Sequence, residues 1–145
     1  YLDRLHLSVG DIISFHAESI HSPDIISQLK NLGLIASVAL NSETSLDRIK
    51  QVLPLVDNVL VMSVRPGFSG QKFIVESLKK IEELLDFQSY HGTHFTLALD
   101  GGINRDTLPL IIPYNITMIA IASAIFNAPD HIKALKEIND LCGTR

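Results

Sequence analysis

The sequence predicts an α/β protein whose strands form a parallel sheet. Short apolar segments begin near Ile12, Ile35, Val59, Phe95 and Thr117, and each is followed by a polar turn and a stretch with helical spacing. These segments are almost continuously apolar, as expected for strands that are covered on both faces. A repeated order of strand and then helix gives a parallel sheet, and either a doubly wound open sheet or part of a barrel has that order.

The first two expected helices follow the first two strands. A serine–proline pair at 22–23 is typical of a helix N-terminus, and Gly33 is typical of its end. Thr44 or Ser45 can cap the next helix, which we expect over 46–53 because its apolar residues recur with helical spacing.

Two longer helices complete the pattern. The third has one apolar stripe, formed by Ile74, Leu78, Ile81 and Leu85. Its charged residues are expected to face water, and they are Lys79, Lys80, Glu82 and Glu83. Pro129 opens the last helix. The stripe of that helix is formed by Ile132, Leu135, Ile138 and Leu141. We expect both stripes to be buried in the core.

Composition limits the partners of this chain. The 145 residues carry a net charge of −4, and the basic residues are scattered, so we expect neither nucleic acid nor an anionic membrane as partner. No apolar run is long enough to span a bilayer. The single cysteine, Cys142, cannot form an internal disulfide, and this favours a reducing cytoplasm.

The chain reads as one domain over residues 1–145, because no linker or low-complexity tract divides it. It is shorter than the roughly 250 residues of a complete eight-fold α/β barrel. The opening residues 1–7 resemble the middle of an amphipathic helix and have no start signal before them, so we expect further residues to precede Tyr1.

The residues that close the strands are the candidates for function, since parallel α/β proteins bind ligands beyond the carboxyl ends of their strands. These closing segments are 16–18, Asn41, 65–71, 100–102 and 122–123. Three of them are glycine-rich or small, which lets backbone N–H groups approach an anion. Each glycine taken alone also fits an ordinary tight turn, so the prediction depends on their convergence.

Asp100 ends an apolar strand and precedes two glycines. A carboxylate in that place is a candidate metal ligand or proton-transfer group. An Asp-Gly pair on its own is more often part of a turn.

Four segments together resemble the ribulose-phosphate 3-epimerase family. They occur in the family's order, and they are 14–18, 61–74, 99–104 and 123–126. The resemblance implies a (β/α)8 TIM barrel, of which this chain supplies about the last five βα units. It also implies that the family's first strands, with its other aspartate and its metal-binding histidines, lie ahead of Tyr1.

The resemblance implies an isomerase of pentose phosphate metabolism that interconverts D-ribulose 5-phosphate and D-xylulose 5-phosphate. A proton leaves C3 and returns on the opposite face through an enediolate, which one divalent metal ion (Zn, Fe, Mn or Co) stabilises. Asp100 matches a family aspartate that is both metal ligand and acid/base.

The resemblance also implies the residues that hold the substrate. The phosphate-binding set is Gly67, Phe68, Ser69, Gly70, Gly101, Gly102, Ala122 and Ser123. Two residues are possible substrate-side contacts, His16 and Met62.

Two of these positions and the nearby Arg65 depart from the family pattern. Ser69 and Ala122 stand where the family usually has glycine, and Arg65 replaces a small polar residue. An alanine forced into a left-handed turn would cost roughly 1 kcal/mol or more. Weaker phosphate binding or a different substrate is the expected consequence.

Two other functions fit the same residues. One is an epimerase of a hexulose phosphate such as allulose 6-phosphate, and the other is a non-catalytic sugar-phosphate binder. In each case the partner is a small sugar phosphate. Five βα units alone would expose strand edges, so we expect poor solubility or pairing, most simply as a homo-oligomer.

Overall fold

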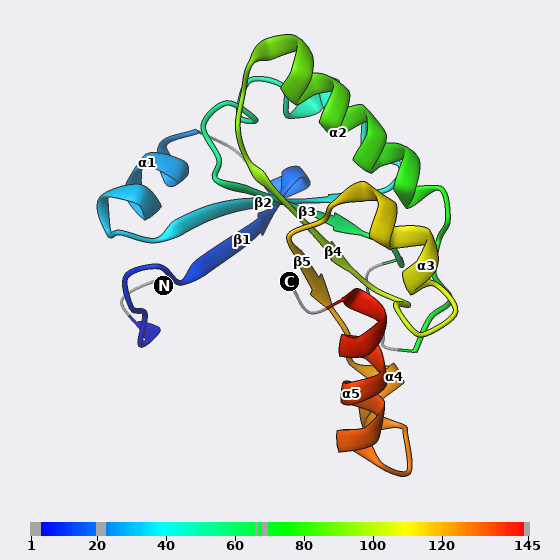
Figure 1. Cartoon of the computed structure of the whole chain (residues 1–145). Coiled ribbons are helices and arrows are strands. Elements are labelled where there is room, and N and C mark those ends of the chain that lie inside the picture. The colour runs from blue at the N-terminus through cyan, green and yellow to red at the C-terminus, as the bar shows by residue number, and fades with distance from the viewer. Residues whose placement is uncertain (1–3, 20–22, 66, 68–69, 144–145) are drawn as a thin grey trace.

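A computed structural model describes residues 4–19, 23–65, 67 and 70–143 of the chain. One parallel sheet runs through it in the order β1-β2-β3-β4-β5 (Figure 1). The strands are β1 (Ile12–His16), β2 (Ile35–Asn41), β3 (Asn58–Met62), β4 (Thr96–Asp100) and β5 (Met118–Ala120). Each begins within one residue of its predicted start, so the predicted order of strands is confirmed.

Helices follow the strands. The α-helices are α1 (Asp24–Asn31), α2 (Ser77–His91), α3 (Leu108–Ile111), α4 (Ser123–Phe126) and α5 (His131–Cys142). Short 3-10 helices are η2 (Ala17–Ser19), η3 (Leu46–Arg48) and η4 (Ile112–Tyr114).

Helices α1, α2 and α3 cover one face of the sheet (Figure 1). Alternate strand residues on that face, such as Val38, Val61 and Leu99, are fully buried in the same cluster as Leu29 of α1 and Ile81 of α2. A doubly wound sheet would reverse its strand order and carry helices on both faces. Here the strands lie side by side in their order along the chain, with one layer of helices, as in the wall of a barrel. The sequence alone had left both a doubly wound sheet and part of a barrel open, and the structure shows the barrel type.

The opposite face of the sheet carries the other alternate residues. Directly paired residues of neighbouring strands point to the same face, so Asn41, Met62, Asp100 and Ala120 form one row at the carboxyl ends of β2 to β5. This row lies at the edge of the sheet where barrel enzymes bind their substrates.

A second row of this face, nearer the beginnings of the strands, is a hydrogen-bonded polar network. The Ser37 hydroxyl donates to Asn58 Oδ1 at 2.8 Å, and Asn58 Nδ2 donates to Thr96 Oγ1 at 2.8 Å. Buried polar groups are stable when they are paired in this way. The network joins β2, β3 and β4 well below the rim.

The prediction of a helix over 46–53 is wrong. Ser45 does cap a turn by accepting from the Asp47 N–H at 3.3 Å, but regular structure stops at Arg48 and single turns follow. Pro54 explains this, because proline disfavours helical geometry in the residue before it and clashes with the turn before that. Ile49, Val52 and Leu53 of the segment are still buried, while Leu46 is half-buried.

The polar face expected for α2 also needs correction. Lys80 is only 6% exposed, although its charge predicted a position in water. Its ammonium group donates to the Glu83 carboxylate one turn later, which pairs the buried charge. Leu84 joins the buried stripe, while Leu85 remains partly exposed.

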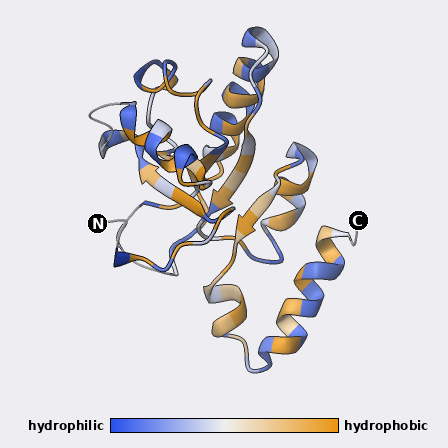
Figure 2. Cartoon of the chain, turned by 90° about the vertical axis from the view of Figure 1, so that its left-hand side faces the viewer, coloured by the Kyte–Doolittle hydropathy of each residue, from blue (hydrophilic) through white to orange (hydrophobic). Residues whose placement is uncertain are grey.

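Helix α5 begins two residues after Pro129, which was predicted to open it, and the helix is little covered. The Asp130 side chain caps it by accepting from the Lys133 N–H at 2.9 Å. Of its apolar stripe, only Ile138 is buried, and Ile132 is 83% exposed. Figure 2 shows this helix standing away from the sheet with orange and blue residues interleaved. The expectation that the whole stripe is core is therefore wrong for the part of the chain that is described.

Among the described residues, no helix has both the length and the apolar composition that crossing a membrane requires.

Candidate functional site

A cavity of about 330 Å³ opens at the carboxyl ends of β3, β4 and β5. Its lining comes from three of the predicted segments and comprises Met62, Val64, Arg65, Gly67, Gly70, Gln71, Asp100, Gly101, Gly102, Ile103, Ala120, Ala122 and Ser123. The structure thus brings most of the predicted site residues into one place. Phe68 and Ser69 lie outside the described residues.

Asp100 provides the only carboxylate among the described residues that line this cavity. It ends β4, pairs in register with Met62 on one side and with Ala120 on the other, and is half-buried. Burial raises the pKa of its carboxyl above the ordinary value, because the charged form loses part of its hydration. A raised pKa brings a carboxyl closer to the range in which it can both take and return a proton.

Gly101 and Gly102 allow the backbone to approach the neighbouring loop very closely. Their φ angles are +117° and +65°, which only glycine adopts readily. A Cβ on Gly101 would lie 2.4 Å from a Val64 methyl carbon, and one on Gly102 would lie 2.5 Å from the Phe73 backbone nitrogen. The two peptide units after Asp100 are therefore presented without side chains.

Ala122 does not take the strained conformation that a glycine at this position would suggest. Its φ is −118°, and it is the residue before α4. The cost of a left-handed alanine therefore does not arise. Ser123 follows it as the first residue of α4 and lines the cavity.

The loop after β3 closes another side of the cavity. Gly67 and Gly70 line it, and the Gln71 side-chain amide donates to the Arg65 carbonyl at 2.5 Å, which fastens the two ends of the loop. Arg65 also borders a neighbouring cavity that contains Glu43 and Glu76. Within the described lining of the cavity that holds Asp100, Arg65 is the one fixed cation.

His16 does not line this cavity. It ends β1, three strands away from β4, and its Nδ1 lies 3.6 Å from a Glu18 carboxylate oxygen. Burial acts to raise the pKa of Glu18, but the 2.8 Å hydrogen bond from the Thr44 hydroxyl and the nearby cations outweigh it, so the pKa is lowered. His16 therefore belongs to a separate polar cluster on the rim.

The described residues do not fit a complete metal site. Among them, no three His, Cys, Asp or Glu side chains lie close enough together to hold an ion. Asp100 supplies one oxygen ligand, and a divalent cation needs several. Asp100 can serve as one member of a ligand set but does not constitute one.

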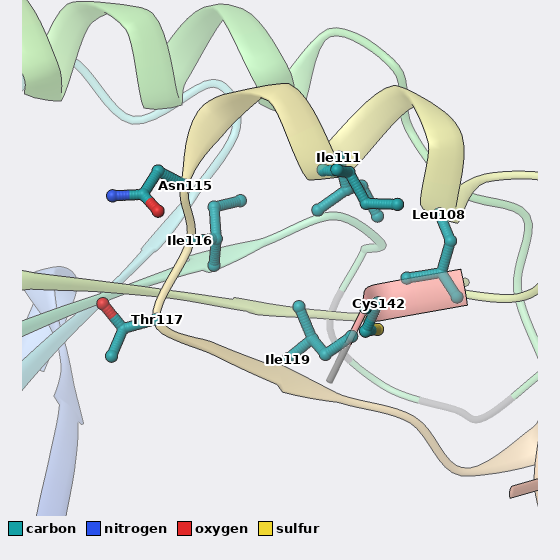
Figure 3. Close-up of a pocket in the computed structure, with 9 residues that line it drawn as sticks. Leu108, Ile111, Asn115, Ile116, Thr117, Ile119 and Cys142 are labelled. Atoms are coloured by element: carbon teal, nitrogen blue, oxygen red, sulfur yellow. The ribbon is translucent and has the colours of Figure 1, made fainter. Parts of the chain in front are cut away.

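A larger cavity of about 450 Å³ lies elsewhere, where β5 begins (Figure 3). Figure 3 shows Leu108 and Ile111 of α3 directed towards Ile119 of β5 and Cys142 of α5. In the part of the chain that the structure describes, none of the residues that line it is charged. It offers no counter-charge for a phosphate there and lies at the wrong ends of the strands for a barrel active site.

Two residues of the rim were not among the predicted site residues, although Asn41 was noted as the end of its strand. Ser63 is fully buried directly after β3 and hydrogen-bonds to the carbonyls of Asp100 and Gly101. Asn41 lies in the same row as Met62 and Asp100, and its Oδ1 is buried without a hydrogen-bond partner among the described residues. Their place at strand ends was the only signal in the sequence.

Several solved structures have a similar fold. The crystal structure of 3-hexulose-6-phosphate synthase aligns with a TM-score of 0.63 at 18% identity, covering 92% of this chain and 62% of that one. That of KGPDC from Streptococcus mutans, in complex with a sugar phosphate, aligns with a TM-score of 0.67 at 16% identity, covering 91% and 61%. At these identities the likeness shows the (β/α)8 barrel fold alone.

Sequence relatives are closer. Ribulose-phosphate 3-epimerase of Methanocaldococcus jannaschii is 42% identical over 131 residues, which are 90% of this chain and 56% of the relative. The Bacillus subtilis enzyme of that name is 36% identical over 95% of this chain and 64% of the relative. Ribulose-5-phosphate-3-epimerase, chloroplastic, of Arabidopsis thaliana is 39% identical over 89% and 47%. The chain thus spans about half to two thirds of these relatives.

The sequence profile of one family matches most of the chain. It is described as the ribulose-phosphate 3 epimerase family, and the match covers residues 1–126, which include all five strands and the whole cavity. Together with relatives above 30% identity, this match identifies the chain. The chain belongs to the ribulose-phosphate 3-epimerase family.

Proposed function

We propose that the protein is a ketose-phosphate 3-epimerase that interconverts D-ribulose 5-phosphate and D-xylulose 5-phosphate. The family and the names of the relatives support this reaction. The observation that carries the proposal is the single cavity in which a half-buried carboxylate, Asp100, lies among three small or glycine-rich backbone turns. A carboxylate for proton transfer beside an anion cradle suits a phosphorylated substrate with an acidic C–H.

Asp100 acts as an acid/base on one face of the substrate. It takes the proton from C3, the electrons of the C–H bond move towards the C2 ketone, and an enediolate forms. Its raised pKa lets the carboxyl hold that proton and return it. Inversion needs a second acid/base on the opposite face, and no second carboxylate or histidine lines the described cavity.

The phosphate group is held by backbone N–H groups of the turns. Gly67, Gly70, Gly101, Gly102 and Ser123 all border the cavity, and the predicted set extends to Phe68, Ser69 and Ala122. N–H groups in such concave turns bind anions without a side-chain charge. The relative in structure, KGPDC, was solved in complex with a sugar phosphate, which supports a ligand of that class here.

A divalent metal ion (Zn, Fe, Mn or Co), the cytoplasmic location and a homo-oligomeric state stay predictions. For the metal, Asp100 would be one ligand, and the proton transfer assigned to Asp100 stands without it. His16 and Met62 stay possible substrate-side contacts. Met62 has the better position, since it pairs with Asp100 and lines the cavity.

We also propose that residues 1–145 are one domain that forms the C-terminal portion of the barrel. The open edges of β1 and β5 and the greater length of the relatives support this. The polypeptide of these residues, purified alone, should aggregate or associate through its unpaired strand edges. Size-exclusion chromatography with thermal unfolding checks this, and a monomer that unfolds cooperatively would count against the proposal.

The reaction is tested by hydrogen exchange at C3. We expect the purified protein in D2O to place deuterium at C3 of D-ribulose 5-phosphate and to produce D-xylulose 5-phosphate, as followed by NMR. Allulose 6-phosphate should react more slowly, because the relatives bear the name of the pentulose enzyme. Faster turnover of the hexulose phosphate would favour a hexulose-phosphate epimerase. Binding without any exchange at C3 would indicate a non-catalytic sugar-phosphate binder.

A further inference from the structure

Ser63 links two strand ends beneath the cavity. It is 0% exposed and follows β3 directly. Its backbone N–H donates to the Asp100 carbonyl at 2.8 Å, and its hydroxyl donates to the Gly101 carbonyl at 2.7 Å, with the Asp100 carbonyl at 3.0 Å. A hydroxyl has one hydrogen, so the two donors of Ser63 suit the two successive carbonyls.

These carbonyls determine the direction of the N–H groups in the same peptide units. In a trans peptide unit the C=O and the N–H lie in one plane and point in opposite directions. The carbonyl of Asp100 shares its peptide unit with the Gly101 N–H, and the carbonyl of Gly101 shares its unit with the Gly102 N–H. Since both carbonyls are held at Ser63, both N–H groups are directed away from Ser63.

The Gly102 N–H, which lies beyond the ladder of β4 and β5, has no backbone partner among the described residues, and Gly102 lines the cavity. Neither glycine can carry a side chain of its own, because a Cβ on Gly101 would clash with Val64 and one on Gly102 with Phe73. The Ser63 carbonyl in turn accepts from the Ile74 N–H at 2.8 Å, which ties the returning loop to the same point. Ser63 is thus the polar side chain that fixes both glycine peptide units.

We propose that Ser63 is a positioning residue: by holding the Gly101 carbonyl it orients the Gly102 N–H towards an anionic phosphate, and by holding the Asp100 carbonyl it keeps the backbone of Asp100 in place. The proposal rests on the proposed function, which makes a sugar phosphate the ligand. What it claims for Ser63, however, is an effect on the binding of a phosphate anion. Charged acceptors strengthen hydrogen bonds, and misdirected donors lose that gain.

The test compares Ser63→Ala with Ser37→Ala in the full-length protein. Ser37 is also 0% exposed, and its hydroxyl also makes a hydrogen bond, but it lies in the polar network at the beginnings of the strands. Both variants should lower the midpoint of thermal unfolding. Only Ser63→Ala should raise the dissociation constant for inorganic phosphate, by about tenfold or more, as measured by calorimetry.

A second variant, Ser63→Cys, keeps the test valid if Ser63→Ala does not fold. A thiol is close in size to the hydroxyl but is a weak hydrogen-bond donor. Ser63→Cys should bind phosphate more weakly than the wild type. Wild-type affinity in Ser63→Cys or Ser63→Ala, or equal weakening in Ser37→Ala, would overturn the proposal, as would a wild type that does not bind phosphate. Exchange at C3 is scored separately, so loss of the epimerase reaction in the wild type and failure of the Ser63 proposal are distinguishable.

Discussion

Replacing Asp100 by asparagine should slow deuterium exchange at C3 of the ketose phosphate by about 10²- to 10⁴-fold, the usual contribution of a positioned acid/base. Asparagine keeps the size of the side chain but cannot accept the proton. Since the glycine turns are unchanged, phosphate affinity should stay close to that of the wild type. NMR exchange rates and phosphate calorimetry measure the two effects in one preparation.

Asp106→Asn is the matched control for this variant. Asp106 is exposed, lies six residues further along and does not line the cavity. Its replacement removes the same charge without touching the site, so exchange should be unaffected. Unchanged exchange in Asp100→Asn would remove Asp100 from the mechanism.

Although Asp100→Asn should slow the reaction, it should stabilise the folded protein at neutral pH. Burial raises the pKa of Asp100 in the folded state, so its protonated form favours folding. That contribution is full below the ordinary pKa and is lost as pH rises through the raised pKa. The ionised carboxylate therefore opposes folding at neutral pH, and Asp100→Asn should melt above the wild type at pH 7 but not in acid.

Replacing Gly102 by alanine should be one of the most damaging single changes in the chain. The left-handed φ of +65° costs alanine about 1 kcal/mol. The new Cβ would also lie 2.5 Å from the Phe73 nitrogen and 2.7 Å from its Cα, so backbone must move at a further cost of about 1–3 kcal/mol. Denaturant unfolding should show the combined loss, and phosphate binding should weaken with it.

Gly92→Ala separates the two causes. Gly92 ends α2 with a φ of +63°, almost the same as Gly102, and a Cβ there meets nothing within 4 Å. This variant should lose only the conformational part, about 1 kcal/mol, and keep its affinity for phosphate. Equal losses of stability in the two variants would show that the backbone at Phe73 moves aside at little cost, so that its contact with Gly102 does not contribute to the loss.

The positions of the strands were predictable because their signals are local. Apolar runs and the turns that follow them fixed the starts of β1 to β5 to within one residue. Which face the helices cover was not predictable from those signals, since a strand with both faces apolar gives no direction. The resemblance of four segments to one family supplied the barrel, and the one-sided layer of helices agrees with it.

The errors arose where one residue or a distant contact outweighs periodicity. Pro54 breaks the helical pattern of the segment after β2, although its apolar spacing is regular. Lys80 is buried because Glu83 pairs with it, and a hydropathy pattern assigns any lysine to water. The exposure of Ile132 depends on what packs beside α5, which no pattern within the helix records.

The residues that line the site were predictable from the sequence, but the hydrogen bonds that hold them in place were not. The rule that ligands bind at the carboxyl ends of parallel strands was enough to group Asp100 with the turns at Gly67, Gly102 and Ser123. The role of Ser63 depends on hydrogen bonds to residues 37 and 38 positions away. Those bonds follow from the register of β3 against β4, which the sequence does not state.

Among the described strands, each one after β1 is hydrogen-bonded to the strand made just before it, and paired residues are separated by only 20 positions (Ala98 and Met118) to 38 positions (Asn58 and Thr96). Each new βα unit can therefore settle against a finished neighbour as the chain leaves the ribosome, with little loop-closure entropy to overcome at any step. Assembly can follow the order of synthesis, and β5, with three residues, is the shortest of the described strands in this sequence of additions.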